Sequence, residues 1–226
     1  MATMRLHFEQ DLERVSQQLL EMGFQADTML DQAVRALSEQ NAALAEQVIA
    51  SDDAIDELDL LIEAECMRLI ALQQPAARDL RLIGTALKVI TDLERIGDHA
   101  VDIAKVARKL AHEPLQMPAT DLTGMAQRVR QMLKDALAAF VEHDLDLVEK
   151  VVAADDDVDT LFHEIRAELH ARMQKDASLV VQASYLLFVA HYLERVADHT
   201  VNIAERVHYV ETGQLAQLAR SHQASS

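Results

Sequence analysis

Two acidic, histidine-containing motifs hold the residues of this chain that are best suited to chemistry. They read LERIGDHAVDIA at residues 93–104 and LERVADHTVNIA at residues 193–204. In each motif three polar side chains follow one another at four-residue steps, a spacing that stacks them one turn apart along a helix. These ladders are Glu94, Asp98 and Asp102 in the first motif and Glu194, Asp198 and Asn202 in the second. Stacked carboxylates repel one another unless a cation or a base lies close to them.

The first acid of each ladder occupies a position where the heptad pattern expects an apolar side chain. Residues seven apart on one helix lie along the same seam. The two seams are Leu80, Leu87, Glu94 and Val101 in the first copy and Val180, Leu187, Glu194 and Val201 in the second. A half-buried carboxylate is costly unless it is paired, hydrogen-bonded or bound to a cation.

A second acidic cluster precedes each motif. These pairs, also four residues apart, are Asp52 and Asp56 in the first copy and Asp155 and Asp159 in the second. About 18 residues separate Asp56 from a turn near residue 74, and about 20 separate that turn from Glu94, so an antiparallel hairpin places both acids at one height. This convergence predicts a multi-carboxylate metal site in each repeat.

Two interpretations of these acids remain open. Oxygen-only ligands favour hard or borderline cations such as Mg, Mn, Ca or Fe. Alternatively, the acids form ion pairs on the helix surface, because Arg95 precedes Asp98 by three residues and Arg195 precedes Asp198 by three. In either case we expect the two arginines to orient the acids rather than to contact a substrate.

The motif histidines are less suited to act as ligands than their type suggests. His99 and His199 each follow an acid of the ladder by one residue. One residue turns a helical side chain by about 100°, which points it away from the stacked acids. We therefore expect histidines that are exposed or satisfied elsewhere.

An internal duplication surrounds the motifs. SDDAIDEL at 51–58 matches ADDDVDTL at 154–161 at an offset of 103, and the motifs recur at an offset of 100. Apolar residues at three- and four-residue steps predict three long helices in each copy. The expected helices span 5–39, 42–73, 75–111, 120–142, 144–175 and 178–211, with Pro75 in the first turn of the third.

Short connections between long helices force neighbouring helices to run antiparallel. The sequence therefore predicts an all-α protein made of two tandem antiparallel three-helix bundles, placed end to end or side by side. The first repeat spans 1–113, the second spans 118–212, and 213–226 is expected to be a disordered tail.

Composition narrows the classes of function. The formal charge of −17 argues against binding to nucleic acid, which depends on Lys and Arg. Cys66 is the single cysteine, the N-terminus lacks the apolar core of a signal peptide, and the longest strongly apolar stretch, Tyr185 to Ala190, is too short to span a bilayer. We expect a cytoplasmic protein that does not insert directly into a membrane.

Catalytic motifs are missing from the sequence. It contains no glycine-rich phosphate loop and no nucleophile elbow. A di-iron bundle needs two Glu-x-x-His motifs, and only Glu205 with His208 has that spacing. We expect no enzyme activity, and a carboxylate-bridged metal enzyme is the weaker alternative.

The motifs and their surroundings resemble a known family. LERIGDHAVDIA preceded by QQPAARDLRLIGTALKVITD, together with YLERVADHTVNIAERVHYVETG, resemble both halves of the PhoU family of phosphate-signalling regulators, over nearly all of 1–212. The resemblance implies a non-enzymatic negative regulator of the phosphate regulon. It also implies two partners, the ATPase subunit of the high-affinity phosphate transporter and the membrane histidine kinase that senses phosphate.

The resemblance also bears on the acids and on assembly. The family's acidic motif, which carries metal in some members, falls on the Glu94–Asp98 and Glu194–Asp198 pairs. It leaves the ion open among Fe, Mn, Mg, Zn and Ca, and a structural helical adaptor without metal remains the alternative. Relatives often associate, and the first helix carries an apolar extension that covers either its own bundle or a second subunit, so we expect a homodimer. The extension contains Leu6, Leu12, Val15 and Leu19.

Overall fold

The described part of the chain is helical, as expected. The computed structural model describes residues 2–73, 75–112, 114–116 and 120–219, and no strand occurs among them. Its helices are α1 (Ala2–Ser38), α2 (Ala42–Ala50), α3 (Asp52–Gln73), α4 (Ala77–Leu110), α5 (Thr120–Glu142), α6 (Leu145–Lys175), the short 3-10 helix η1 (Ala177–Leu179) and α7 (Val180–Thr212).

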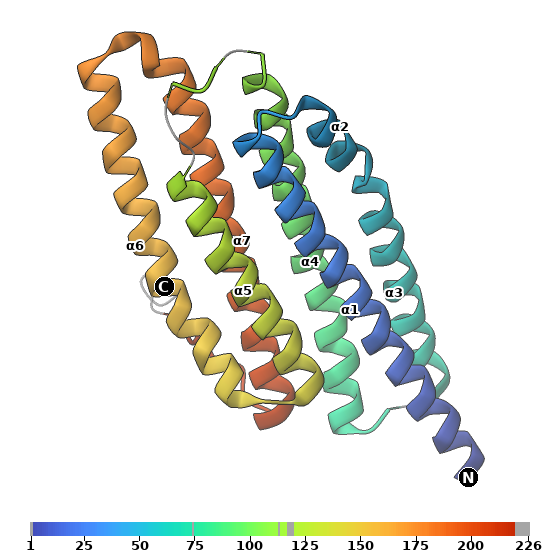
Figure 1. Ribbon diagram of the computed structural model, residues 1–226. Coiled ribbons are helices and arrows are strands. Elements are labelled where there is room, and N and C mark those ends of the chain that lie inside the picture. The colour runs from blue at the N-terminus through green and yellow to red at the C-terminus, as the bar shows by residue number, and fades with distance from the viewer. Residues whose placement is uncertain (1, 74, 113, 117–119, 220–226) are drawn as a thin grey trace.

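The two three-helix bundles lie side by side. Helices α1, α4, α5 and α7 form the centre of the molecule, with α1 against α5 and α4 against α7 across the boundary between the repeats (Figure 1). Helix α3, preceded by α2, lies at one outer edge, and α6 lies at the other (Figure 1). The sequence had left open whether the bundles meet side by side or end to end.

The extension of α1 covers its own bundle. The side chains of Val15 and Leu19 are buried in the core, and Phe8 is nearly so. The side chain of Leu6 lies outside the described residues. Arg68 of α3 fastens the same stretch by donating to Asp11 of α1 at 2.8 Å. The apolar surface that suggested a subunit contact is therefore used within the chain.

Two predicted helix boundaries were wrong. The helix expected over 42–73 is interrupted at Ser51, whose hydroxyl and amide both bond to the carbonyl of Val48 instead of continuing the helical ladder. The corresponding residue of the second copy is Ala154, which cannot make such a side-chain bond, and α6 runs through it unbroken. Pro75 precedes the extended N-cap residue Ala76, so it lies just outside α4 rather than in its first turn.

A charged cluster joins the repeats where α1 crosses α5. Arg130 donates to both oxygens of Asp27, at 2.7 and 3.0 Å, and also pairs with Asp31. Lys134 approaches the same Asp27 at 3.6 Å. The offset of 103 makes Asp27 the counterpart of Arg130 and Asp31 the counterpart of Lys134. The duplicated positions have therefore acquired opposite charges that face each other, and the bidentate geometry fixes how the helices meet.

Helix α7 combines a core position with an apolar composition. Ala177–Thr212 is the one helical stretch in the described part of the chain that is long and apolar enough to cross a membrane, with a mean hydropathy of 1.2. An unbroken apolar run was therefore too narrow a criterion. Helix α7 packs against α4, α5 and α6, but only 28% of its apolar window is buried, so core packing accounts for part of that composition.

Beyond α7 the chain leaves its helix at Gly213, whose positive φ of 73° suits glycine at a helix C-terminus. Residues 214–219 contain no helix, yet the amide of Leu218 donates to Glu205 at 2.6 Å and Ala219 is buried. The remaining residues of the expected tail, 220–226, lie outside the described residues, as do residues 113 and 118, where the two repeats are expected to end and begin.

Helices α3 and α4 approach closely beside the acidic motif. A Cβ placed on Gly97 would lie 2.8 Å from Cδ1 of Ile55, which is buried. The second copy has Ala197 and Val158 at the matching positions, both buried. In the first copy the extra methyl group belongs to Ile55 on α3. In the second copy it belongs to Ala197 on the motif helix α7.

We expect this exchange of methyl groups to appear as an energetic coupling. Gly97→Ala gains helix propensity but overpacks against Ile55, whereas in an Ile55→Val background the new methyl group has room. The gain in unfolding free energy from Gly97→Ala should therefore be larger in that background, by about 0.5–1.5 kcal/mol.

Denaturant unfolding of the four proteins measures this coupling. Gly84→Ala serves as the control, because a Cβ there would meet no atom within 4 Å. Its gain in unfolding free energy should be the same with Ile or Val at residue 55. Equal gains from both alanines, with no coupling to Ile55→Val, would contradict the packing argument.

Candidate functional site

The structure brings the acids of α3 and α4 together in the first repeat. Glu94 is half-buried, with 27% of its side chain exposed. Burial raises the pKa of Glu94, and the charge of Asp98 raises it further. The charge of Asp56 on the neighbouring helix α3 also raises this pKa. Arg95 opposes these effects without overcoming them, so the pKa of Glu94 remains above its ordinary value.

Asp52 belongs to the same group of acids. Burial raises its pKa, followed by the charges of Asp56 and of Asp98 on α4. Lys105 lowers the pKa of Asp52 by a smaller amount. The charges of Asp52, Asp56, Glu94 and Asp98 thus act on one another across α3 and α4, as expected if the four acids converge.

Sequence reasoning missed one acid at this place. Asp59 raises the pKa of Glu94, and its own pKa is raised by burial, by Glu63 and by Asp56. It follows Asp56 by three residues and so lies on the same side of α3, a spacing that could have revealed it. The second repeat has Phe162 at the corresponding position, so the two sites differ in acid content.

The second repeat gathers a similar set between α6 and α7. Burial raises the pKa of Glu194, and the charges of Asp198 and of Asp159 on α6 raise it further. His191 and Arg195 lower it. Asp155 is almost fully buried, in keeping with a position between helices.

One oxygen in this second set suits a cation. Oε2 of Glu194 is buried without a hydrogen-bond partner in the described structure, although Nδ1 of His191 lies 3.1 Å away. A buried carboxylate oxygen without a partner is the kind of atom that a bound cation satisfies. In their present rotamers, however, no three His, Cys, Asp or Glu side chains of the described residues are arranged to hold a metal ion. Binding would require the carboxylates to reorient.

Both motif arginines contact the acids. Nη1 of Arg95 lies 3.0 Å from Asp98 and its Nε lies 3.3 Å from Glu94, while Arg195 pairs with Asp198 at 2.6 Å. The expected ion pairs are thus present. Because about half of each arginine side chain is exposed, each pair contributes roughly 0–1 kcal/mol to stability.

The third member of each ladder lies away from the other two. Asp102 pairs with Lys105 at 2.9 Å, and Asn202 donates to Asp92 of α4 at 3.1 Å. Four residues advance a helix by 400°, so each step turns the ladder by about 40° and the third member by about 80°. That rotation moves Asn202 out of the acid cluster and into the contact between α4 and α7.

The motif histidines lie in that same contact. Nδ1 of His199 is 2.9 Å from Asp92, while the ring of His99 stacks on Tyr192 with centroids 5.7 Å apart. Burial lowers the pKa of His99 to about 4, which keeps its ring neutral. His199 is satisfied by Asp92, as expected, whereas His99 is neither exposed nor satisfied, because its Nδ1 is buried without a hydrogen-bond partner in the described structure. Asp92 and Tyr192 are the residues that sequence reasoning missed here, and they occupy equivalent positions in the two copies.

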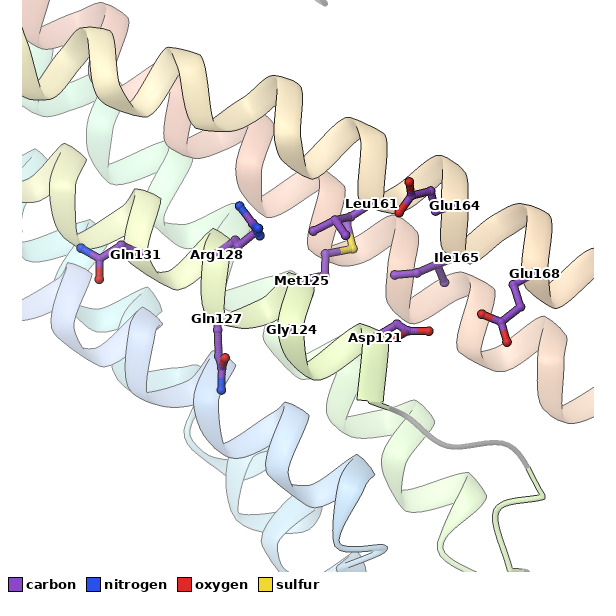
Figure 2. A pocket seen from close by; sticks show the side chains of 10 residues that line it. All are labelled: Asp121, Gly124, Met125, Gln127, Arg128, Gln131, Leu161, Glu164, Ile165 and Glu168. Atoms are coloured by element: carbon purple, nitrogen blue, oxygen red, sulfur yellow. The ribbon is translucent and has the colours of Figure 1, made fainter.

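A separate hollow of about 620 Å³ lies between α5 and α6 (Figure 2). None of the predicted metal ligands lines it. Helix α5 begins at Thr120, the counterpart of Gln17, so it has no equivalent of the first fifteen residues of α1. In the first repeat Glu65 contacts Arg14 of that extension, whereas its counterpart Glu168 lines the open hollow (Figure 2). The hollow is therefore explained by the shorter helix.

Comparison with known proteins agrees with this architecture. The model of the PhoU domain matches residues 19–107 and again residues 122–207. A protein of Clostridium acetobutylicum described as a phosphate-specific transport system accessory protein PhoU homolog is 44% identical, over 93% of this chain and 97% of its own length. A homolog with the same description from Aquifex aeolicus is 40% identical, over 91% of this chain and 93% of its own length.

Solved structures show the same arrangement of helices. The crystal structure of PhoU from Pseudomonas aeruginosa matches with a TM-score of 0.88 and 36% identity, over 92% of this chain and the whole of that one. The phosphate transport system regulatory protein PhoU from Streptococcus pneumoniae matches with a TM-score of 0.88 and 32% identity, over 93% and 100%. With two matched domains in tandem and relatives aligned along almost its full length, the chain belongs to the PhoU family.

Proposed function

We propose that this protein is a cytoplasmic, non-enzymatic regulator of phosphate uptake and of the phosphate-starvation response. It acts as a negative modulator between the ATPase subunit of the high-affinity phosphate transporter and the membrane histidine kinase that senses phosphate. The observation that carries the proposal is the tandem pair of domains, aligned from end to end with proteins described as accessories of phosphate-specific transport. A signalling role through protein contacts suits a body built of packed helices, in which long outer surfaces are available to partners.

We further propose that each repeat binds a divalent or trivalent metal ion through its acids. In the first repeat the ligands are drawn from Glu94, Asp98, Asp52 and Asp56, and in the second from Glu194, Asp198, Asp155 and Asp159. Three features support this: acids from two helices influence each motif glutamate, the pKa of each motif glutamate is raised, and Oε2 of Glu194 lacks a hydrogen-bond partner in the described structure. A cation would offset the burial and the repulsion that together raise these pKa values.

Asp102 and Asn202 take a different part in this proposal. Asn202 donates to Asp92 across the contact between the repeats, whereas Asp102 pairs with Lys105 on its own helix, so we place both outside the central set of ligands. Arg95 and Arg195 hold the acids in place while the metal is absent and swing away when it binds.

A helical adaptor without metal is the second candidate function. It is favoured by the contacts of Arg95 and Arg195 with the acids and by side-chain rotamers that form no three-ligand group in the described residues. In that case the acids keep the motif helices hydrated and paired, and regulation depends on protein contacts alone.

Deletion of the gene tests the cellular role. Loss of a negative modulator should switch on phosphate-starvation genes in phosphate-rich medium, measured as alkaline phosphatase activity. Expression of the intact chain from a plasmid should restore repression, and the empty plasmid is the control. Unchanged activity in a strain with no second copy of the gene would contradict the proposal.

Capture of partners tests the signalling link separately. From phosphate-replete cells, the tagged chain should retain the transporter's ATPase subunit and the kinase, identified by mass spectrometry. The same tag on an unrelated acidic helical protein controls for non-specific ionic capture. Recovery of neither partner, with the deletion phenotype intact, would place the protein elsewhere in the pathway.

The metal proposal predicts opposite responses to chelator and to metal. Glu94→Gln with Asp98→Asn removes repulsion, so with chelator present the variant should melt at the same temperature as the wild type or above it. Added Mn or Fe should raise the melting temperature of the wild type, because bound metal stabilises the folded state in proportion to ln(1 + [L]/Kd). The melting temperature of the variant should rise much less, because the variant keeps only the second site.

A matched variant separates local from overall charge. Asp53→Asn with Glu57→Gln removes the same two charges from the exposed face of α3 and should leave the metal response unchanged. If the motif variant is destabilised in chelator and the wild type ignores metal, the arginine pairs account for the acids and the adaptor function stands.

A further inference from the structure

One helix face in the described structure is apolar but has no partner. On α3, Leu60, Ala64, Met67 and Ala71 are exposed, with 65% of Leu60 and 55% of Met67 accessible to water. These four residues, called here the α3 stripe, lie opposite the buried face of the same helix. The packing neighbours of α3 are α1, α2 and α4, and Figure 1 shows its far side at the edge of the molecule.

The duplication provides an internal comparison for this stripe. The matching positions of α6, which lies at the other edge, are His163, Ala167, His170 and Gln174, all exposed. The two outer helices therefore have the same position in the fold but different chemistry on the outer face. An outer helix that only faces water needs no apolar residues on its outer face, as α6 shows. An exposed apolar stripe on α3 is therefore typical of a surface that contacts a partner.

The spacing of the stripe is that of a coiled-coil seam. Steps of four, three and four residues place Leu60 and Met67 at d positions and Ala64 and Ala71 at a positions of a heptad. In an antiparallel pair of helices, a positions face d positions of the partner. A second α3 running in the opposite direction would thus place Leu60 against Ala71 and Met67 against Ala64.

This arrangement matches large side chains to small ones throughout. Each large residue of one stripe faces an alanine of the other, and an alternation of this kind lets two helices approach closely and interdigitate. A parallel pair would instead place Leu60 on Leu60 and Ala64 on Ala64. The sequence of the stripe is therefore complementary to itself only when it is reversed, which is the condition for a two-fold symmetric contact.

The flanks of the stripe are compatible with the antiparallel pair. Antiparallel helices bring e positions together on one side and g positions together on the other. Here Leu61 meets Arg68 of the second copy, whose aliphatic stem can cover it, and Glu63 meets Ile70. No two like charges are placed directly opposite each other along these twelve residues.

We propose that the α3 stripe is the interface of a homodimer, formed by antiparallel pairing with α3 of a second copy of this chain. The contact extends over about 17 Å of helix, from residue 60 to residue 71. A single pair of helices buries less than the roughly 800 Å² per partner of a standard interface. The dimer is therefore in equilibrium with the monomer, and its population depends on concentration. This proposal does not depend on the metal sites or on the role in phosphate signalling.

Sedimentation equilibrium of the full chain tests the interface. The mass of the wild type should rise with concentration from the 25.2 kDa of one chain towards twice that value. Leu60→Glu with Met67→Glu places like charges in the seam and should keep the mass at one chain. The matched control is His163→Glu with His170→Glu on α6, which should associate as the wild type does. Circular dichroism checks that all three proteins are folded.

Disulfide trapping tests the direction of the pairing. Ala64→Cys and Met67→Cys, prepared as separate proteins and mixed under oxidising conditions, should form a mixed disulfide more readily than either forms alone. Cys66 does not interfere, because it is fully buried and burial raises the pKa of its thiol to about 11.

Three results would overturn the proposal. One is a wild type that stays monomeric up to roughly 1 mM, the dissociation constant of a very weak interface. Another is a dimer that Leu60→Glu with Met67→Glu does not weaken. The last is preferential disulfide formation by each single variant with itself, which would indicate a parallel pair.

Discussion

The contact between α4 and α7 is the interaction on which the rest of the structure depends. Each of these helices carries one copy of the acidic motif, and each motif faces in two directions. Glu94 and Asp98 face the outer helix of their own repeat, while His99, one residue on, faces the other repeat and stacks on Tyr192. Because 100° separates consecutive helical residues, one short sequence can serve an outer acid cluster and an inner interface together. This double use explains why the chain contains the motif twice.

The two copies have diverged where they meet and where they face solvent. At the crossing of α1 and α5, one ancestral position has become Asp27 in one copy and Arg130 in the other, and the pair is now bidentate. Identical residues at such a crossing would place like charges together, a cost that two different residues avoid. On the outer helices the copies differ in hydrophobicity instead, since Met67 of α3 corresponds to His170 of α6. The different residues at the centre hold the repeats together. The different residues on the outer helices give the two edges of the molecule different surface chemistry.

Much of this arrangement follows from periodicity in the sequence. Helix identity, antiparallel order and the meeting of Asp56 with Glu94 all depend on the 3.6-residue repeat and on hairpin length, which are local quantities. The break at Ser51 was not foreseen, because it depends on one hydroxyl that competes for a carbonyl. The rotation of Asn202 into the interface required knowing that a four-residue ladder drifts around the helix. Side-by-side packing of the bundles was undetermined, since it depends on pairs such as Asp27 with Arg130 that lie 103 positions apart.

In the metal proposal, the arginine contacts and the bound ion compete for the same oxygens. Asp98 directs Oδ2 at Arg95, and a carboxylate that turns to a cation loses that contact. An exposed pair of this kind contributes roughly 0–1 kcal/mol, whereas a ligand at a hundred times its dissociation constant stabilises the folded state by about 2.7 kcal/mol. The arginine would therefore set only a small barrier to the proposed occupancy, and it leaves the pKa of Glu94 above its ordinary value. If the metal proposal holds, ion pairs and metal binding are two states of one acid cluster, and the concentration of free metal decides between them.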